Sequence, residues 1–119
     1  MLGQILKSLQ ESHFVKDFEV IELVEEESLT FLKIKVTFFE GSLLFIKESV
    51  FKDSSKYSYH WQDQKANLIV RWDNSPHRSH IPTHPHHKHV GKDVLPSHRV
   101  FIEDVLKEIQ ERITSPSQS

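Results

Sequence analysis

Strict alternation of apolar and polar residues in one central stretch constrains the fold of this chain more than any other feature. Within residues 29–39, three apolar side chains alternate with three polar ones, namely Ile34, Val36 and Phe38 with Lys33, Lys35 and Thr37. Successive side chains of a β-strand point to opposite faces, so the stretch predicts a strand with one buried face. Glu40-Gly41 follows, and glycine can adopt the positive φ that a tight two-residue hairpin requires. We therefore expect residues 42–51 to return as the antiparallel partner.

Three further segments are predicted to be strands, because they are rich in β-branched residues or alternate between apolar and polar residues. They are residues 18–24, 57–62 and 68–73. Short polar segments with turn-forming residues separate the consecutive strands. Strands that follow one another through short turns usually pair with their neighbours in sequence. The sequence therefore predicts a five-stranded antiparallel meander.

Each end of the chain carries an amphipathic helical pattern. Apolar residues recur at helical spacing in residues 1–14 and again in residues 100–113. Two such helices must bury their apolar stripes against a face of the sheet. We expect an α+β fold with N-terminal and C-terminal helices, a single domain over residues 1–113, and a disordered tail at residues 114–119.

Residues 74–98 contain four of the five prolines and few apolar residues. This composition predicts a long His-rich loop before the last helix rather than a regular strand, and loops of such length are often functional. Seven of the nine histidines lie there, and residues 71–99 hold five lysine or arginine residues against two aspartates. The whole chain has a net charge of −2, so this basic stretch is a local feature that predicts an anion site.

The composition excludes several classes of chemistry. Cysteine is absent, which rules out disulfides, a thiolate nucleophile and cysteine-ligated zinc. The N-terminal residues lack a signal-peptide pattern, and the chain has no apolar run of about 18 residues. We expect a cytoplasmic protein that does not enter a membrane.

Parity along the strands predicts where polar side chains gather. If the turn between residues 57–62 and 68–73 contains an even number of residues, His60 and Arg71 project from the same face. Asp73 lies on that face too, and the aromatic residues point the other way. The alternative is that these are surface residues of the strands without a chemical role.

Cleavage of RNA without metal needs a base for the 2′-hydroxyl, an acid for the 5′-oxygen and a cation near the phosphate. Imidazole, guanidinium and ammonium groups meet these needs near neutral pH. The candidate catalytic residues are His60, Arg71, Asp73, His77, His86, His87, Lys88 and His89.

The same histidines allow two other interpretations. His84, His86, His87 and His89 supply neutral nitrogens within six positions, and a divalent transition metal such as zinc or nickel accepts three of them. The set His86, His87 and His89 is the predicted ligand set in that case, whereas the acid–base interpretation needs no cofactor. The third interpretation is a solvated, pH-sensitive loop.

Three segments together carry a resemblance to a known family: Tyr59-His60-Trp61-Gln62, Arg71-Trp72-Asp73-Asn74-Ser75-Pro76-His77 and Pro85-His86-His87-Lys88-His89-Val90-Gly91. They resemble the TumE-like family of small prokaryotic toxins, over about residues 40–112. The resemblance implies the toxin of a type II toxin–antitoxin pair, encoded beside a helix-turn-helix antitoxin.

We therefore expect a toxin that acts as a metal-independent endoribonuclease, with RNA as its substrate. The alternatives are a non-enzymatic module that binds RNA or protein through the basic His-rich loop, and a metal-dependent nuclease with histidine ligands. The sequence leaves open whether identical chains associate into a homo-oligomer.

Overall fold

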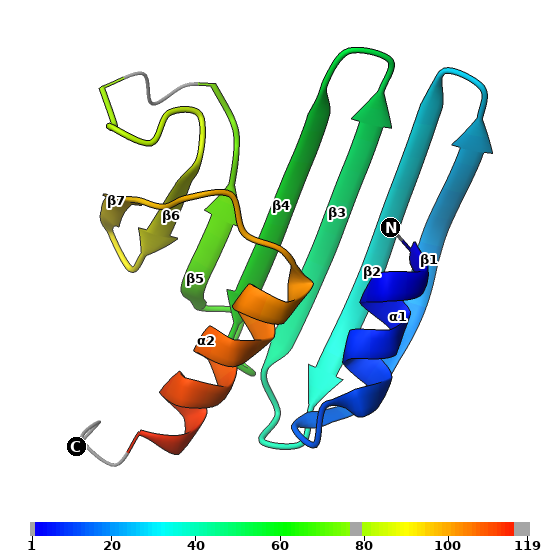
Figure 1. The fold of residues 1–119 in the computed structure, drawn as a ribbon. Coiled ribbons are helices and arrows are strands. Elements are labelled where there is room, and N and C mark those ends of the chain that lie inside the picture. The colour runs from blue at the N-terminus through cyan, green and yellow to red at the C-terminus, as the bar shows by residue number, and fades with distance from the viewer. Residues whose placement is uncertain (1, 77–79, 116–119) are drawn as a thin grey trace.

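A computed structural model describes residues 2–76 and 80–115 of the chain (Figure 1). The described residues form one antiparallel sheet whose strands follow in sequence order, with both helices on the same face. The helices are α1 (Leu2–Glu11) and α2 (Ile102–Thr114). The strands are β1 (Val15–Glu26), β2 (Leu29–Phe38), β3 (Leu43–Phe51), β4 (Ser55–Gln62), β5 (Leu68–Asp73), β6 (His87–Val90) and β7 (Asp93–Pro96).

The core lies between the helices and the sheet, as the alternation predicts. Apolar side chains of β2 to β5 that share one parity are buried, including Ile34, Ile46, Tyr59 and Trp72. The stripes of α1 and α2 pack against them through residues such as Leu9 and Ile109. Because one strand face supplies the core, the opposite face of the sheet, which we call the open face, keeps the polar side chains.

The hairpin between β2 and β3 differs in length from the prediction. Gly41 does adopt a positive φ of 104°, but β2 ends at Phe38 and β3 begins at Leu43, so the connection is longer than two residues. The Glu40 carboxylate accepts a hydrogen bond from the backbone N–H of Ser42 at 2.8 Å. A Cβ at position 41 would meet only the flexible, exposed side chain of Gln64, so the positive φ is the main reason for glycine.

The α+β fold and the antiparallel meander are confirmed, but the expected number of five strands is wrong, because the described residues form a sheet of seven. Residues 74–98, expected to be a loop throughout, contain the β6–β7 hairpin, which extends the sheet beyond β5. Few apolar residues are needed there, because the backbone of β6 pairs with β5, and its polar side chains have partners on β5 and on α2. Gly91, with φ of 59°, begins the tight turn between Val90 and Asp93.

The ends of the helices also differ from the prediction. Helix α1 stops at Glu11, and β1 begins at Val15, earlier than expected. Thr114, where the expected tail begins, still belongs to α2, and residues 116–119 of that expected tail lie outside the described residues. No helix in the described part of the chain is long and apolar enough to cross a membrane.

Candidate functional site

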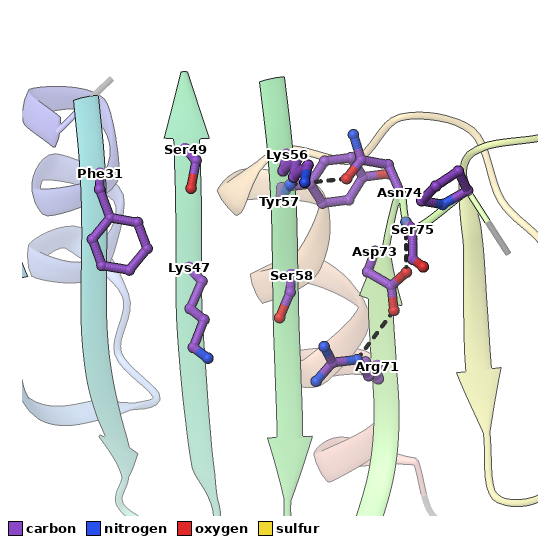
Figure 2. A pocket seen from close by; sticks show the side chains of 11 residues that line it. Phe31, Lys47, Ser49, Lys56, Tyr57, Ser58, Arg71, Asp73, Asn74 and Ser75 are labelled. Carbon is purple, nitrogen blue, oxygen red and sulfur yellow. Dashed lines mark hydrogen bonds and ion pairs between the residues drawn. The ribbon is translucent and has the colours of Figure 1, made fainter. Parts of the chain in front are cut away.

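Side chains in register on neighbouring strands form rows across the open face. One row, which we call the arginine row, runs through Lys35, Phe45, His60, Arg71 and His89 on β2 to β6. The next, which we call the aspartate row, runs through Lys33, Lys47, Ser58, Asp73 and His87. Figure 2 shows part of both rows, with the helices behind the sheet.

A register shift decides that His60 and Arg71 share the open face. The loop between β4 and β5 contains an odd number of residues, 63–67, but the pairing shifts by one residue between Trp61 and Gln62. Ile69 is left without a register partner on β4, and His60 then pairs directly with Arg71. The shift therefore gives the arrangement that the sequence analysis expected for a turn with an even number of residues, with His60 and Arg71 on the same face.

His60 is held in one tautomer by its two neighbours. The Arg71 guanidinium donates to Nδ1 of His60 across 3.3 Å, because arginine has no acceptor, and Nε2 then donates to the Gln62 side-chain oxygen at 3.2 Å. Burial lowers the pKa of His60 below its usual value, and the nearby Arg71 charge lowers it further, while Gln62 acts in the opposite direction. His60 is therefore set up as a neutral imidazole.

Arg71 connects the two rows. Its Nε donates to Oδ2 of Asp73 at 3.1 Å, and its Nη1 reaches His60 in the other direction. The Arg71 side chain keeps 38% of its surface exposed, while the Asp73 side chain keeps 7%. A guanidinium fixed on two sides and open to solvent on the third can bind an anion through its remaining N–H groups.

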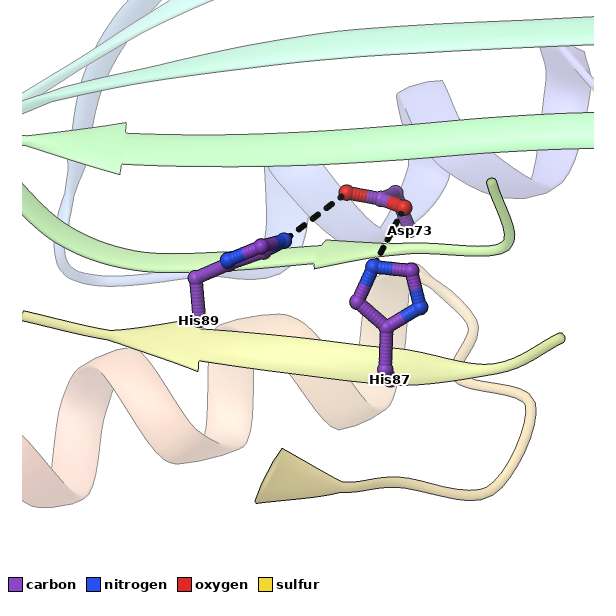
Figure 3. Close-up of side chains that lie close together, drawn as sticks. All are labelled: Asp73, His87 and His89. Atoms are coloured by element: carbon purple, nitrogen blue, oxygen red, sulfur yellow. Dashed lines mark ion pairs between the residues drawn. The ribbon is translucent and has the colours of Figure 1, made fainter. Parts of the chain in front are cut away.

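Two histidines of β6 also point towards the Asp73 carboxylate (Figure 3). Its Oδ1 lies 3.0 Å from Nε2 of His87, and its Oδ2 lies 3.7 Å from Nε2 of His89. The backbone N–H of Ser75 donates to Oδ1 at 2.9 Å, and the two imidazole rings meet edge to face at 5.0 Å. The carboxylate therefore has a polar partner for both oxygens although it is almost fully buried.

The surroundings of His87 place an acceptor at each ring nitrogen. Nδ1 lies 2.9 Å from the backbone oxygen of Pro85, which can only accept, so Nδ1 carries a proton. Nε2 faces the Asp73 carboxylate, another acceptor. Both contacts are satisfied when the ring carries two protons, or when a cation lies between Nε2 and the carboxylate.

A group of three potential metal ligands results from this convergence. One ligand atom from each of Asp73, His87 and His89 lies within 4.8 Å of the others. The set differs from the predicted set of three histidines, because His86 is replaced by Asp73. Two imidazoles and a carboxylate are a common donor set for divalent transition metals.

His86 lies apart from this group. Its Nδ1 lies 2.9 Å from the Tyr57 hydroxyl, and the two rings stack at 5.7 Å. Tyr57 belongs to the face of β4 that the helices cover. Burial is the main cause that lowers the pKa of His86, and the Arg99 charge adds to it.

Lys88 also points away from the open face. Its Nζ lies 3.2 Å from Oε1 of Glu108 on α2. His77, the remaining candidate, lies outside the described residues. Of the eight candidates from the sequence, the structure brings together His60, Arg71, Asp73, His87 and His89.

Two hollows adjoin the rows and reveal residues that the sequence analysis did not single out. Phe31, Lys47 and Asp73 help to line one hollow, and Lys33 and Phe45 help to line the other, while Lys47, Ser58 and Arg71 line both. The alternation of β2 and β3 already separated these lysines from the core. Their proximity to Arg71 follows only from strand pairing.

Comparison with known proteins identifies a family. The family model described as Toxin TumE matches residues 5–113, nearly the whole chain and the full extent of both rows. No curated protein and no solved structure matches the chain.

Proposed function

Because the chain belongs to the TumE toxin family, we propose that it is the toxin of a type II toxin–antitoxin pair and acts as an endoribonuclease. The proposal rests on one observation above all: two imidazoles, His60 and His89, flank the guanidinium of Arg71 at consecutive register positions. Neighbouring strands are about 4.8 Å apart, so the two histidines are separated by about 10 Å at the backbone. A phosphodiester bound to Arg71 fits between them.

Arg71 and His60 act together in the first step. An RNA phosphate binds the exposed guanidinium and competes with Nδ1 of His60 for its N–H groups. The lone pair of Nδ1 is then available to take the proton of the 2′-hydroxyl, a task for which a neutral imidazole is required. The lowered pKa of His60 keeps it neutral near physiological pH.

His89 supplies the proton for the leaving 5′-oxygen. It lies on the other side of Arg71, with its Nε2 3.7 Å from Oδ2 of Asp73. Asp73 and His87 are positioning residues in this scheme, since they hold Arg71 and the β6 backbone in place. The products would carry a 2′,3′-cyclic phosphate and a 5′-hydroxyl.

A metal-dependent nuclease is the second candidate, favoured by the convergence of Asp73, His87 and His89. The bond from Nδ1 of His87 to a backbone carbonyl is the arrangement that commonly orients a metal-bound histidine. A divalent ion there would activate water or stabilise charge on the phosphate. His86 would take no part, contrary to the prediction from sequence.

Partner and compartment follow from the toxin assignment. Membership of a toxin family implies an antitoxin, and we propose a helix-turn-helix protein encoded beside this gene as that partner. We also propose that the toxin acts in the cytoplasm, where its RNA substrate is found. A neighbouring reading frame without such a protein would count against this pairing.

The decisive experiment incubates the purified chain with total RNA, with and without a chelator, and identifies the new RNA ends. We expect cleavage in the presence of chelator and cyclic phosphate ends. His60→Ala and His89→Ala should abolish cleavage, whereas His13→Ala, at an exposed histidine remote from the rows, should not.

Three results would contradict parts of the proposal. Loss of cleavage in chelator, restored by zinc or manganese, would replace acid–base chemistry with the metal centre. RNA binding without cleavage would favour the non-enzymatic module. Full growth arrest by the folded His60→Ala chain would remove His60 from the site.

A further inference from the structure

We infer that the open face of β2 to β5 binds a single-stranded segment of RNA and guides it to Arg71. The inference rests on the proposed function, because it gives the substrate class of the same site. Most of its evidence is separate, since the lysines of β2 to β4 and the residues Phe31 and Phe45 take no part in the proposed chemistry. Charge, aromatic side chains and the shape of the surface each contribute.

On strands β2 to β5 the charge of this face is mainly positive. On β2 to β5 the described open-face side chains include five cations, namely Lys33, Lys35, Lys47, Lys56 and Arg71. They include one carboxylate, that of Asp73, which is already engaged by Arg71 and His87. On β2 to β5 the cations therefore outnumber the carboxylates, and such a surface attracts a phosphate backbone.

The cationic surface has an acidic border on β1. Glu19 pairs in register with Lys35, and Glu22 pairs with Lys33. These carboxylates would repel a phosphate backbone bound over β1. Because Glu19 and Glu22 lie directly opposite Lys35 and Lys33, the attractive area is centred on β3 to β5, around Lys47, Lys56 and Arg71.

Two phenylalanines interrupt the lysines on the same face. Phe45 belongs to the arginine row and pairs with both Lys35 and His60, with its ring 6.4 Å from that of His60. Phe31 lines the neighbouring hollow beside Lys47. Aromatic rings among cations are the usual means of binding single strands, because each base can stack on a ring while its phosphate meets a cation.

Stacking distinguishes a single strand from a duplex. The bases of an RNA duplex are already stacked on one another and cannot lie on Phe45 or Phe31. A base stacked on Phe45 would place the adjoining phosphate beside His60 and Arg71, its neighbours in the same row. The surface therefore suits an unpaired segment.

The test measures binding of a fluorescent, 2′-O-methylated RNA, which lacks the free 2′-hydroxyl and cannot be cleaved by the proposed reaction. Fluorescence anisotropy compares the single strand with the duplex of the same sequence. We expect the single strand to bind more tightly. Lys47→Glu should weaken its binding by about tenfold and reduce the slope of log affinity against log salt by about 1.

Matched variants separate the open face from general charge effects. Lys107→Glu changes an exposed lysine on α2, on the other side of the sheet, and should leave affinity unchanged. Phe45→Ala should lower affinity by about tenfold, whereas Phe39→Ala, at the exposed end of the hairpin, should have little effect. Circular dichroism confirms that each variant is folded.

Tighter binding of the duplex, or unchanged affinity in Lys47→Glu, would overturn the inference. It would also fail if Lys47→Glu abolished antitoxin binding but not RNA binding, since the face would then be a protein interface. If the expected binding pattern holds but natural RNA is not cleaved, the nuclease proposal fails and this surface stands. If Lys47→Glu and Phe45→Ala both cleave natural RNA at the wild-type rate, the nuclease proposal is supported and the proposed binding surface is wrong.

Discussion

Asp73 on β5 lies opposite His87 on β6, with 3.0 Å between Oδ1 and the Nε2 atom of the histidine. Both residues are almost fully buried, with 5% and 2% of their surfaces exposed. A buried carboxylate is stable only when its oxygens have partners, and Arg71 and Ser75 supply the others. The pair therefore joins the β6–β7 hairpin to the sheet and holds Arg71 at the same time.

Asp73→Ala should destabilise the chain by about 3 kcal/mol, because it leaves the partners of a buried charge unmatched. Urea unfolding monitored by tryptophan fluorescence measures the change. Glu111→Ala, at an exposed position of α2, is the control and should alter the free energy of unfolding by less than about 0.5 kcal/mol. Equal stability of Asp73→Ala and the wild type would contradict the structural role.

The lowered pKa of His60 predicts a pH dependence of stability. A histidine whose pKa is lower in the folded chain is protonated more readily when unfolded, so acid favours unfolding. The contribution is fully present above the ordinary histidine value of about 6.5 and is lost as the pH falls through the folded pKa. The urea midpoint should fall less between about pH 7.5 and pH 5 in His60→Gln than in the wild type, with His13→Gln as the unchanged control.

Arg71→Lys should lower the cleavage rate by at least about tenfold although the charge is kept. An ammonium group cannot donate two parallel hydrogen bonds to a phosphate, and it cannot replace both the Asp73 and His60 contacts. Single-turnover cleavage of a defined RNA measures the effect. A lysine variant as active as the wild type would show that only the charge matters.

His86→Ala and Lys88→Met should retain cleavage, because both side chains contact residues away from the open face. The partly exposed ion pair of Lys88 with Glu108 should contribute less than about 1 kcal/mol to stability. Growth arrest on expression and cleavage of RNA by the purified variants check the prediction. If either variant is folded but inactive, the site extends to the helix side of the sheet.

Local sequence patterns were sufficient for the central strands and the helices. Alternation along β2 to β4 separates core from open face, since parity is a property of the strand itself. The assignment of Tyr59 and Trp72 to the core is confirmed. Helical spacing likewise placed α1 and α2 to within a few residues.

The β6–β7 hairpin could not be predicted in this way. Strand β6 is mostly polar, and a periodicity argument has no apolar signal to follow in His87-Lys88-His89-Val90. The burial of His87 is balanced by Asp73, which is distant along the chain. A pattern within one short segment therefore cannot reveal that Asp73 and His87 become partners.

The sequence by itself determined which side chains could share a face, because the alternation of a strand depends only on its own residues. Tertiary structure decided which of them meet. One register shift beside Trp61 places His60 opposite Arg71, and the pairing of β6 with β5 adds His87 and His89 while directing Lys88 to α2. Register depends on hydrogen bonds between strands and on the packing of the whole sheet, so a single residue of shift changes the membership of the site.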